Sequence, residues 1–285
     1  MGLPGDGSGK EKGMKRRIGW VAVLISSIIG ATMAGPVAAG ELRIGGTGAV
    51  TDVLRALAPD FTAQTGIALV VIPSLGSSGA NNAVADGQLG LAVSGRDLRE
   101  KEKARGLQVV GVLRTPYGLV TSRPGPDGLA SANVVSLYKS AKPLWPDGMP
   151  MLIVLRPADD SDNDVLAAVF PGMAEALAQL RKRRDLSIAA TDQDNADMAE
   201  RMAGSLVGAT LTQIRAEKRS LRFVALDGVM PTLEAYLDGS YPHGKLLYLV
   251  APATPSAEAK AFVDFLAGPA ARSRLRDLGL VAGAR

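Results

Sequence analysis

The sequence predicts an α/β protein of two lobes, each a mainly parallel sheet flanked by helices, with a ligand cleft between the lobes. Three observations lead to this prediction. From Glu41 onward, apolar runs of strand length alternate with segments of helical periodicity. The 285 residues are enough for two lobes that each bury a core. Polar or glycine-rich loops follow three successive apolar runs, which is where open α/β sheets bind ligands.

The first of these segments supply the three strand and loop pairs. Strands are predicted at residues 42–44, 67–72 and 89–93, and a helix with apolar residues at helical spacing is predicted between the first two strands, ending at Gly66. Each strand leads into a loop that carries hydroxyls, glycines or charge. These loops meet at one edge of the predicted sheet, and we expect the binding site there.

The rest of the chain repeats the alternation. The predicted elements are strands at 117–121, 151–156 and 245–251, helical stretches at 165–180 and 198–214, an acidic loop at 159–164 and an amphipathic helix at 256–267. We expect two strands to cross between the lobes. The predicted boundaries are 1–39 for a signal peptide with an N-terminal extension, 41–116 for the first part of lobe 1, 117–245 for lobe 2, and 246–285 for the return to lobe 1.

The N-terminal segment has the layout of a secretory signal peptide. Three basic residues at 15–17 precede an uncharged run at 18–33 and a small-residue segment that ends at Ala39. This predicts export to the periplasm through a cleavable signal. The alternative is an uncleaved N-terminal anchor, which leaves the rest of the chain on the same side of the membrane. Because Met14 opens a more typical signal, residues 1–13 are interpreted as an extension or a misplaced start.

Composition excludes several classes of function. Without residues 1–39, which carry five basic and two acidic residues, the net charge falls from +4 to +1, so there is no basic field for nucleic acid. Aromatic residues make up only 4%, too few for base-stacking surfaces. The chain has no cysteine and one histidine, which excludes thiolate and histidine-rich metal sites. We expect a monomer that needs no cofactor, has no metal site and does not bind nucleic acid.

An ordered set of motifs carries a family resemblance. Residues 74–79 read Ser-Leu-Gly-Ser-Ser-Gly, and residues 226–232 read Leu-Asp-Gly-Val-Met-Pro-Thr, followed by Gly-Ser-Tyr-Pro at 239–242 and Leu-Leu-Tyr-Leu-Val at 246–250. This set resembles the periplasmic phosphate-binding family of ABC-transporter solute-binding proteins. The resemblance spans most of residues 41–281 and implies the type II periplasmic-binding-protein fold, with a small anionic solute as ligand.

The predicted site combines glycines, hydroxyls and helix N-termini. Glycine lets the backbone approach an oxyanion, a helix N-terminus offers unpaired N–H groups, and hydroxyls complete the coordination. The resemblance implies that Ser77 contacts the ligand; the alternative is a tight turn with Ser78 as helix cap. The predicted arginines serve either as forks for an oxyanion or as surface residues. The predicted ligand-binding residues are Thr47, Gly48, Ser77, Ser78, Gly79, Ser94, Arg96, Arg156 and Ser161.

Two loops depart from the family pattern. Where relatives carry glycine-serine-glycine-threonine, this chain reads Asp160-Ser161-Asp162-Asn163, and Ala49 stands where relatives place a hydroxyl. Carboxylates beside a phosphate dianion cost Coulomb energy, so orthophosphate itself is in question. The alternating aspartates at 160, 162 and 164 also suggest a cation-binding variant as an alternative, although the distal glutamate of a calcium loop is missing.

The leading hypothesis is an extracytoplasmic protein that captures a small phosphate-like oxyanion for an ABC permease, without covalent chemistry. The alternative is a degenerate binding-fold sensor or adaptor that signals to a membrane partner. An enzyme is the least supported hypothesis, and no catalytic residue is predicted. A Ser-His-Asp site would need His243, which lies far from any nucleophile motif, and no Gly-x-Ser-x-Gly occurs.

Overall fold

The computed structural model describes residues 1–2, 40–125 and 128–282. The predicted signal peptide falls almost wholly on residues 3–39, outside the described residues, so it stays a prediction. Among the residues described, no helix is both long enough and apolar enough to cross a bilayer.

Twelve strands are assigned in the described residues. They are β1 (Gly40–Gly46), β2 (Ile67–Ile72), β3 (Leu91–Ser94), β4 (Leu107–Thr121), β5 (Gly128–Leu129), β6 (Leu152–Leu155), β7 (Ser187–Ile188), β8 (Ser205–Thr210), β9 (Arg222–Phe223), β10 (Ala225–Leu226), β11 (Gly244–Pro252) and β12 (Val281–Ala282). The three strands predicted near the start of the fold correspond to β1, β2 and β3.

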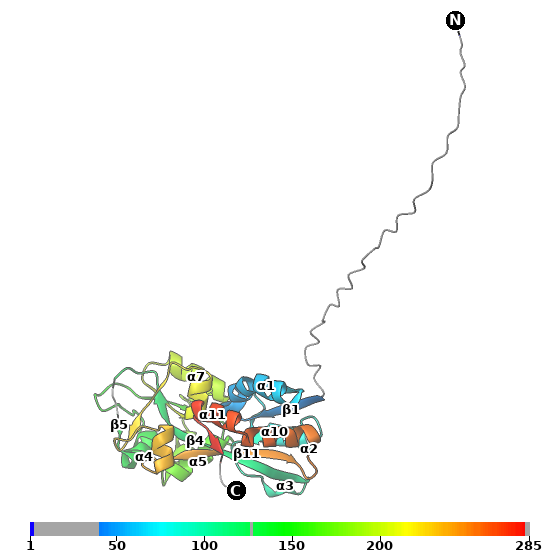
Figure 1. The fold of residues 1–285 in the computed structure, drawn as a ribbon. Helices are drawn as coiled ribbons and strands as arrows, with labels where there is room; N and C mark the ends of the chain where they lie inside the picture. Colours follow the sequence, from blue (N-terminus) through cyan, green and yellow to red (C-terminus); the bar gives the residue numbers. More distant parts are fainter. Residues whose placement is uncertain (3–39, 126–127, 283–285) are drawn as a thin grey trace. The chain divides into compact units, whose positions relative to one another are not determined.

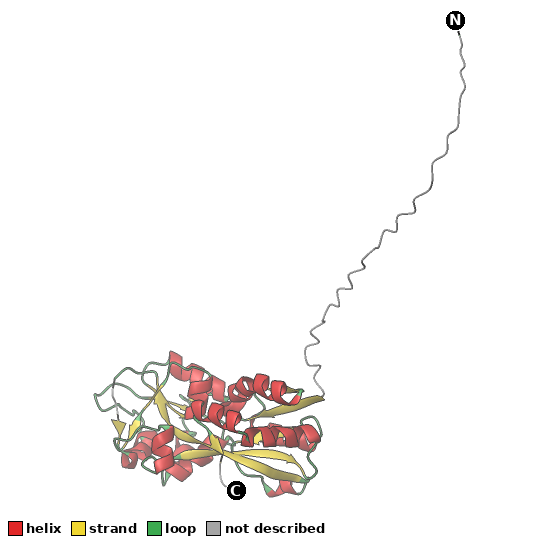
Figure 2. Cartoon of the chain, in the orientation of Figure 1, coloured by secondary structure: helices red, strands yellow, loops and turns green. Residues whose placement is uncertain are grey.

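The helices lie between these strands. They are η1 (Gly48–Val50), α1 (Thr51–Thr65), α2 (Gly76–Ala85), α3 (Glu100–Lys103), α4 (Ser131–Lys139), α5 (Ser161–Val169), α6 (Met173–Leu180), α7 (Asp192–Arg201), α8 (Leu211–Ala216), α9 (Leu233–Asp238), α10 (Ala257–Ala267) and α11 (Pro269–Asp277). Each of the two groups of strands is flanked by helices (Figure 2).

The strands pair in the order β2-β1-β3-β11-β4-β8-β6-β7. β1 pairs in parallel with β2 and β3, and β6 pairs in parallel with β7 and β8. Among the assigned strands of the described residues, every antiparallel pair involves β4 or β11. β4 pairs with β11 up to Pro116 and with β8 from Tyr117, so it runs through both groups of strands. Figure 1 shows β4 and β11 between the two groups of helices.

Each lobe buries apolar side chains on both faces of its sheet, because successive residues of a strand point to opposite faces. In lobe 1, Leu249 of β11 packs with α1 and α10, whereas its neighbour Val250 packs with α2. In lobe 2, Leu206 of β8 packs with α5 and α6, whereas Val207 packs with α7 and α8. The fold-class prediction of two α/β lobes joined by two crossing strands is confirmed. The lobe boundaries at residues 116 and 245 stay a prediction.

One predicted element is wrong. The helical stretch expected at 198–214 contains strand β8, with α7 ending before it and α8 beginning after it. All six residues of β8 are buried, so the run has no alternation of polar and apolar residues. A short strand buried on both faces cannot be distinguished from a buried helix by its periodicity.

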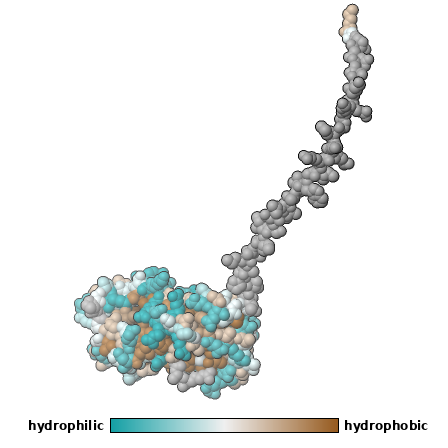
Figure 3. All heavy atoms as spheres, viewed as in Figure 1, coloured by the Kyte–Doolittle hydropathy of each residue, from teal (hydrophilic) through white to brown (hydrophobic). Residues whose placement is uncertain are grey.

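The surface does not carry one continuous apolar patch on the face shown in Figure 3, where hydrophilic and hydrophobic residues are intermixed. Scattered exposed apolar residues are normal for a protein in water. The loops that line the candidate site follow the carboxyl ends of β1, β2, β6 and β7.

Candidate functional site

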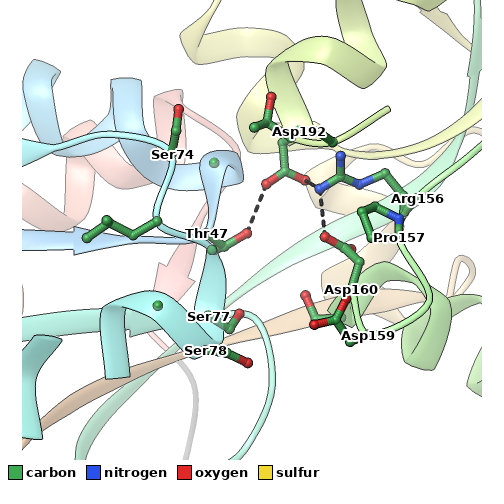
Figure 4. Close-up of a pocket in the computed structure, with 16 residues that line it drawn as sticks. Thr47, Ser74, Ser77, Ser78, Arg156, Pro157, Asp159, Asp160 and Asp192 are labelled. Carbon is green, nitrogen blue, oxygen red and sulfur yellow. Dashed lines mark hydrogen bonds and ion pairs between the residues drawn. The ribbon is translucent and has the colours of Figure 1, made fainter. Parts of the chain in front are cut away.

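A cavity of about 190 Å³ lies where four loops from the two lobes meet. The loops lead into η1, α2, α5 and α7, so several helix N-termini face the same space (Figure 4). Helix N-termini carry unpaired N–H groups and the positive end of the helix dipole. The residues that line the cavity are Thr47, Gly48, Ser74, Leu75, Gly76, Ser77, Ser78, Gly79, Arg156, Pro157, Asp159, Asp160, Ser161, Ala190, Thr191 and Asp192.

The wall formed by α2 is rich in hydrogen-bond donors. The helix begins at Gly76 without a side-chain cap and without an acidic residue in its first turn, which leaves its first N–H groups open to a ligand. Ser77 Oγ accepts a hydrogen bond from the Gly95 N–H at 2.8 Å, and Ser78 Oγ accepts one from Arg96 Nη2 at 2.9 Å. Each hydroxyl therefore keeps its own proton to donate.

The turn before α2 has an unusual backbone. Ser74 has a φ of 60° and Gly76 a φ of 64°, so the chain reverses sharply between β2 and the helix. A left-handed conformation is rare for residues other than glycine, and such residues concentrate at functional sites. The reversal places Ser77 and Ser78 at the cavity.

Arg96 contacts the α2 wall on the side away from the cavity, where it donates to Ser78. Its guanidinium donates to both carboxylate oxygens of Glu102 at 2.8 Å, and neither residue lines the cavity. Burial alone would raise the pKa of Glu102, but the hydrogen bonds from Arg96, the Arg99 N–H and Asn81 outweigh it and lower that pKa to about 2. The ion pair neutralises Arg96, so its role here is to hold Ser78 in place.

The opposite wall belongs to lobe 2 and centres on Arg156. Its Nη1 donates to the Ala189 carbonyl at 3.0 Å, and its Nη2 donates to Asp160 Oδ2 at 2.7 Å. Asp160 is also the N-cap of α5, where its other oxygen accepts the Asp162 N–H. Arg156 is therefore a buried cation that is already partly neutralised at the edge of the cavity.

Asp192 joins the two walls. Its Oδ2 accepts hydrogen bonds from Thr47 Oγ1 and from the Ala49 N–H, both at 3.1 Å, and its Oδ1 lies 3.6 Å from Arg156 Nη2 (Figure 4). Burial alone would raise the pKa of Asp192, but Lys245 and Arg156 outweigh it and lower the pKa. An ionised carboxylate thus stands at the loop of lobe 1 where a solute oxygen was expected.

A second buried ion pair lies beneath the site. Lys245 Nζ on β11 donates to Asp162 Oδ1 in the first turn of α5, and both side chains are almost completely buried. Burial raises the pKa of Asp162 to about 6, although Lys245 opposes the rise. This pair links a crossing strand to the helix whose N-terminus faces the cavity.

The structure brings most of the predicted site residues together. Ser94 and Arg96 are the two that do not line the cavity; Ser94 is buried and donates to the Arg96 carbonyl at 2.6 Å. The predicted residues that do line it are Thr47, Gly48, Ser77, Ser78, Gly79, Arg156 and Ser161. Two positions depart from the family pattern. Ala49 donates its backbone N–H to Asp192, and residues 160–163 form the N-cap and the first turn of α5.

Sequence reasoning missed Asp192 and Lys245. Asp192 follows Thr191, which forms a capping box with Asp194, and that spacing indicates a helix start at this position. The signal for Lys245 was its place at the start of the apolar run of β11. A lysine that is buried with such a strand needs a carboxylate partner.

The alternatives based on metal binding and catalysis gain nothing from the geometry. No group of three or more His, Cys, Asp and Glu side chains in the described residues could hold a metal ion. Asp160 and Asp162 instead contact Arg156 and Lys245. His243 lies outside the cavity lining and packs against Tyr241, with 5.2 Å between ring centroids.

Two lobes and a polar cavity at the carboxyl ends of strands are the features of the type II periplasmic-binding-protein fold. Residues 31–270 match the PBP superfamily domain, so the chain belongs to the PBP (periplasmic binding protein) superfamily. The predicted resemblance is confirmed. Among curated proteins, none matches the chain significantly.

Solved structures with low sequence identity share the fold. A protein from Clostridium perfringens, described as a phosphate ABC transporter substrate-binding protein with bound phosphate, has a TM-score of 0.73 and 20% identity, covering 86% of this chain and 100% of its own. An ABC-type phosphate transport receptor from Vibrio cholerae has a TM-score of 0.59 and 15% identity, with 85% and 100% covered. The periplasmic molybdate-binding protein of Azotobacter vinelandii has a TM-score of 0.57 and 16% identity, with the same coverage.

Proposed function

We propose that this protein captures a small oxyanion in the cleft between its lobes and delivers it to an ABC permease. The observation that carries the proposal is the α2 wall: an uncapped helix N-terminus with two serine hydroxyls, each of which accepts a hydrogen bond from the protein and keeps its proton for a ligand. Such a wall offers donors only, and its natural partner is an anion.

The size of the cavity and its arginine support the same class of ligand. A volume of about 190 Å³ suits a small ion better than a large organic molecule, since pockets for drug-sized ligands typically measure about 300–1,000 Å³. Arg156 supplies a cation on the wall opposite α2. Three solved structures with the same fold also support an oxyanion ligand. Two are described as phosphate transport proteins and one as a molybdate-binding protein.

The remaining parts of the proposal follow from this role. We propose export through the N-terminal signal, action as a monomer outside the cytoplasm, and no catalytic step. The lobes are proposed to comprise residues 41–116 with 246–285, and residues 117–245. Closure of the lobes encloses the ligand between α2 on one side and Arg156 on the other.

A second candidate is a sensor or adaptor that docks a membrane partner without shuttling a solute. The observation that favours it is that the cations at and beneath the site, Arg156 and Lys245, contact the protein's own carboxylates. This candidate expects no oxyanion binding, so one experiment separates the two.

Isothermal titration of the purified protein with phosphate, sulfate, molybdate and perrhenate tests the proposal. We expect saturable one-to-one binding of at least one of these ions, accompanied by a rise in melting temperature because a ligand that binds only the folded state stabilises it. Absence of heat and of any thermal shift with all four ions contradicts the proposed function and favours the sensor.

A further inference from the structure

The charges that line the cavity are out of balance. Among the described residues that line it, Arg156 is the single cation, whereas Asp159, Asp160 and Asp192 provide three carboxylates. The lining therefore carries an excess of two negative charges before any solute is bound. A solute anion has to bind against this excess.

The cations outside the lining do not correct the imbalance. Arg96 forms an ion pair with Glu102, and Lys245 forms one with Asp162. Each pair is close to neutral when seen from the cavity. Arg181, which donates to Asn163 Oδ1 and interacts with Asp160, adds one positive charge near the lining, and this does not offset two excess negative charges.

The helix dipoles also favour only one wall. The N-termini of α5 and α7 already have acidic residues, Asp160 as the N-cap of α5 and Asp192 in the first turn of α7. Of the three α-helices whose N-termini face the cavity, only α2 has neither a capping side chain nor an acid in its first turn. Its N-terminus contributes about half a positive charge. This partial charge favours an anion at the α2 wall, but it does not offset the two excess negative charges of the lining.

Asp192 already occupies donors that a solute oxygen would need. It accepts from Thr47 Oγ1 and the Ala49 N–H in lobe 1, and it faces Arg156 in lobe 2. The neighbouring Gln193 strengthens this bridge, because its Nε2 donates to the Gly48 carbonyl at 3.0 Å. The carboxylate is held in place from both lobes, so a solute binds beside it.

We propose that the cleft prefers a singly charged oxyanion to a doubly charged one of the same shape, and that Asp192 sets this preference. The inference rests on the proposed function and names the class of ligand. A second negative charge about 4–6 Å from Asp192, at an effective dielectric constant of about 20, weakens binding by about a hundred- to a thousandfold.

Perrhenate and tungstate provide the test, because both are tetrahedral oxyanions of similar size and they carry one and two negative charges. Their affinities are measured by titration calorimetry on the purified protein, on Asp192→Asn and on Asp194→Asn. Asparagine keeps an oxygen that accepts from Thr47 and Ala49, so Asp192→Asn removes charge while preserving the bridge. Asp194 lies on the same helix outside the cavity lining, which makes Asp194→Asn the charge-matched control.

We expect the unmodified protein to bind perrhenate more tightly than tungstate. Asp192→Asn is expected to shift the ratio of affinities at least tenfold toward tungstate, and Asp194→Asn to leave the ratio within about twofold. Tungstate binding as tight as perrhenate binding, or an unchanged ratio in Asp192→Asn, overturns this inference and leaves the proposed function standing. If neither ion binds any of the three proteins, this inference fails, and the titrations with phosphate, sulfate and molybdate decide the proposed function.

Discussion

Gly95 of lobe 1 lies directly against Ser161 of lobe 2. A Cβ atom at position 95 would be 2.6 Å from Ser161 Oγ and 2.8 Å from Lys245 Cε. Contacts between a Cβ and other heavy atoms are not found at such distances, so a larger residue here would displace the side chains of Ser161 and Lys245. The contact joins the loop after β3 to the first residue of α5.

Gly95→Ala is therefore expected to prevent full closure of the cleft while leaving each lobe folded. We expect oxyanion binding to weaken more than tenfold and small-angle scattering to report a larger radius of gyration. Gly128→Ala is the control, because the nearest atom to a Cβ there is 3.5 Å away. A variant with unchanged affinity and unchanged scattering would show that this contact does not limit closure.

Removal of either hydroxyl on the α2 wall should weaken ligand binding. Hydrogen bonds to a charged group contribute about 1.5–3 kcal/mol, so Ser77→Ala and Ser78→Ala are each expected to reduce oxyanion affinity by about ten- to a hundredfold. Ser136→Ala, on the exposed surface of α4, is the matched control because its hydroxyl only caps a local carbonyl at 2.7 Å. Affinities measured by calorimetry that stay within about twofold in both cavity variants would contradict the assignment of the α2 wall.

The buried pair of Lys245 and Asp162 is expected to matter for stability when it is broken. Removal of one partner leaves an uncompensated buried charge, so Lys245→Met should lower the free energy of unfolding by about 3–5 kcal/mol in urea denaturation. Replacement of both partners, Lys245→Met with Asp162→Leu, should restore much of this loss. A single variant that loses less than about 1 kcal/mol would mean that the pair is hydrated rather than buried.

The lowered pKa of Glu102 predicts that the folded protein loses stability in acid. Its pKa is about 2 in the folded protein, below the ordinary value of 4.5, so the folded state binds its proton less readily than the unfolded state does. The resulting stabilisation, about 3 kcal/mol, is present above pH 4.5 and disappears as the pH falls from 4.5 to 2. Unfolding of Glu102→Gln followed across this pH range should lack that contribution; the same steep pH dependence in the variant would refute this origin.

Local patterns in the sequence were enough to predict the fold class and seven of the sixteen residues that line the cavity. The loops after β1 and β2 were identified because glycines and hydroxyls directly follow apolar strands. Strand β8 was missed because it is buried on both faces and shows no alternation. Local periodicity thus fails where an element has no solvent face.

Relationships between distant residues could not be predicted in this way. Thr47 and Asp192 are 145 residues apart, and only the closed arrangement of the lobes brings them together. Arg96 was expected either at the ligand or on the surface beside Glu100 and Glu102, and only the structure shows that it pairs with Glu102 and donates to Ser78. Charges at an interface between lobes are set by tertiary packing rather than by their neighbours in sequence.

The most direct test of the central claim is the position of a bound oxyanion. Crystals grown with perrhenate and measured at the rhenium absorption edge would locate the ion by its anomalous signal. We expect a single strong peak in the cavity, within hydrogen-bonding distance of Ser77, Ser78 and the first N–H groups of α2. Peaks confined to the outer surface, or no peak in crystals that contain the ion at saturating concentration, would contradict the account.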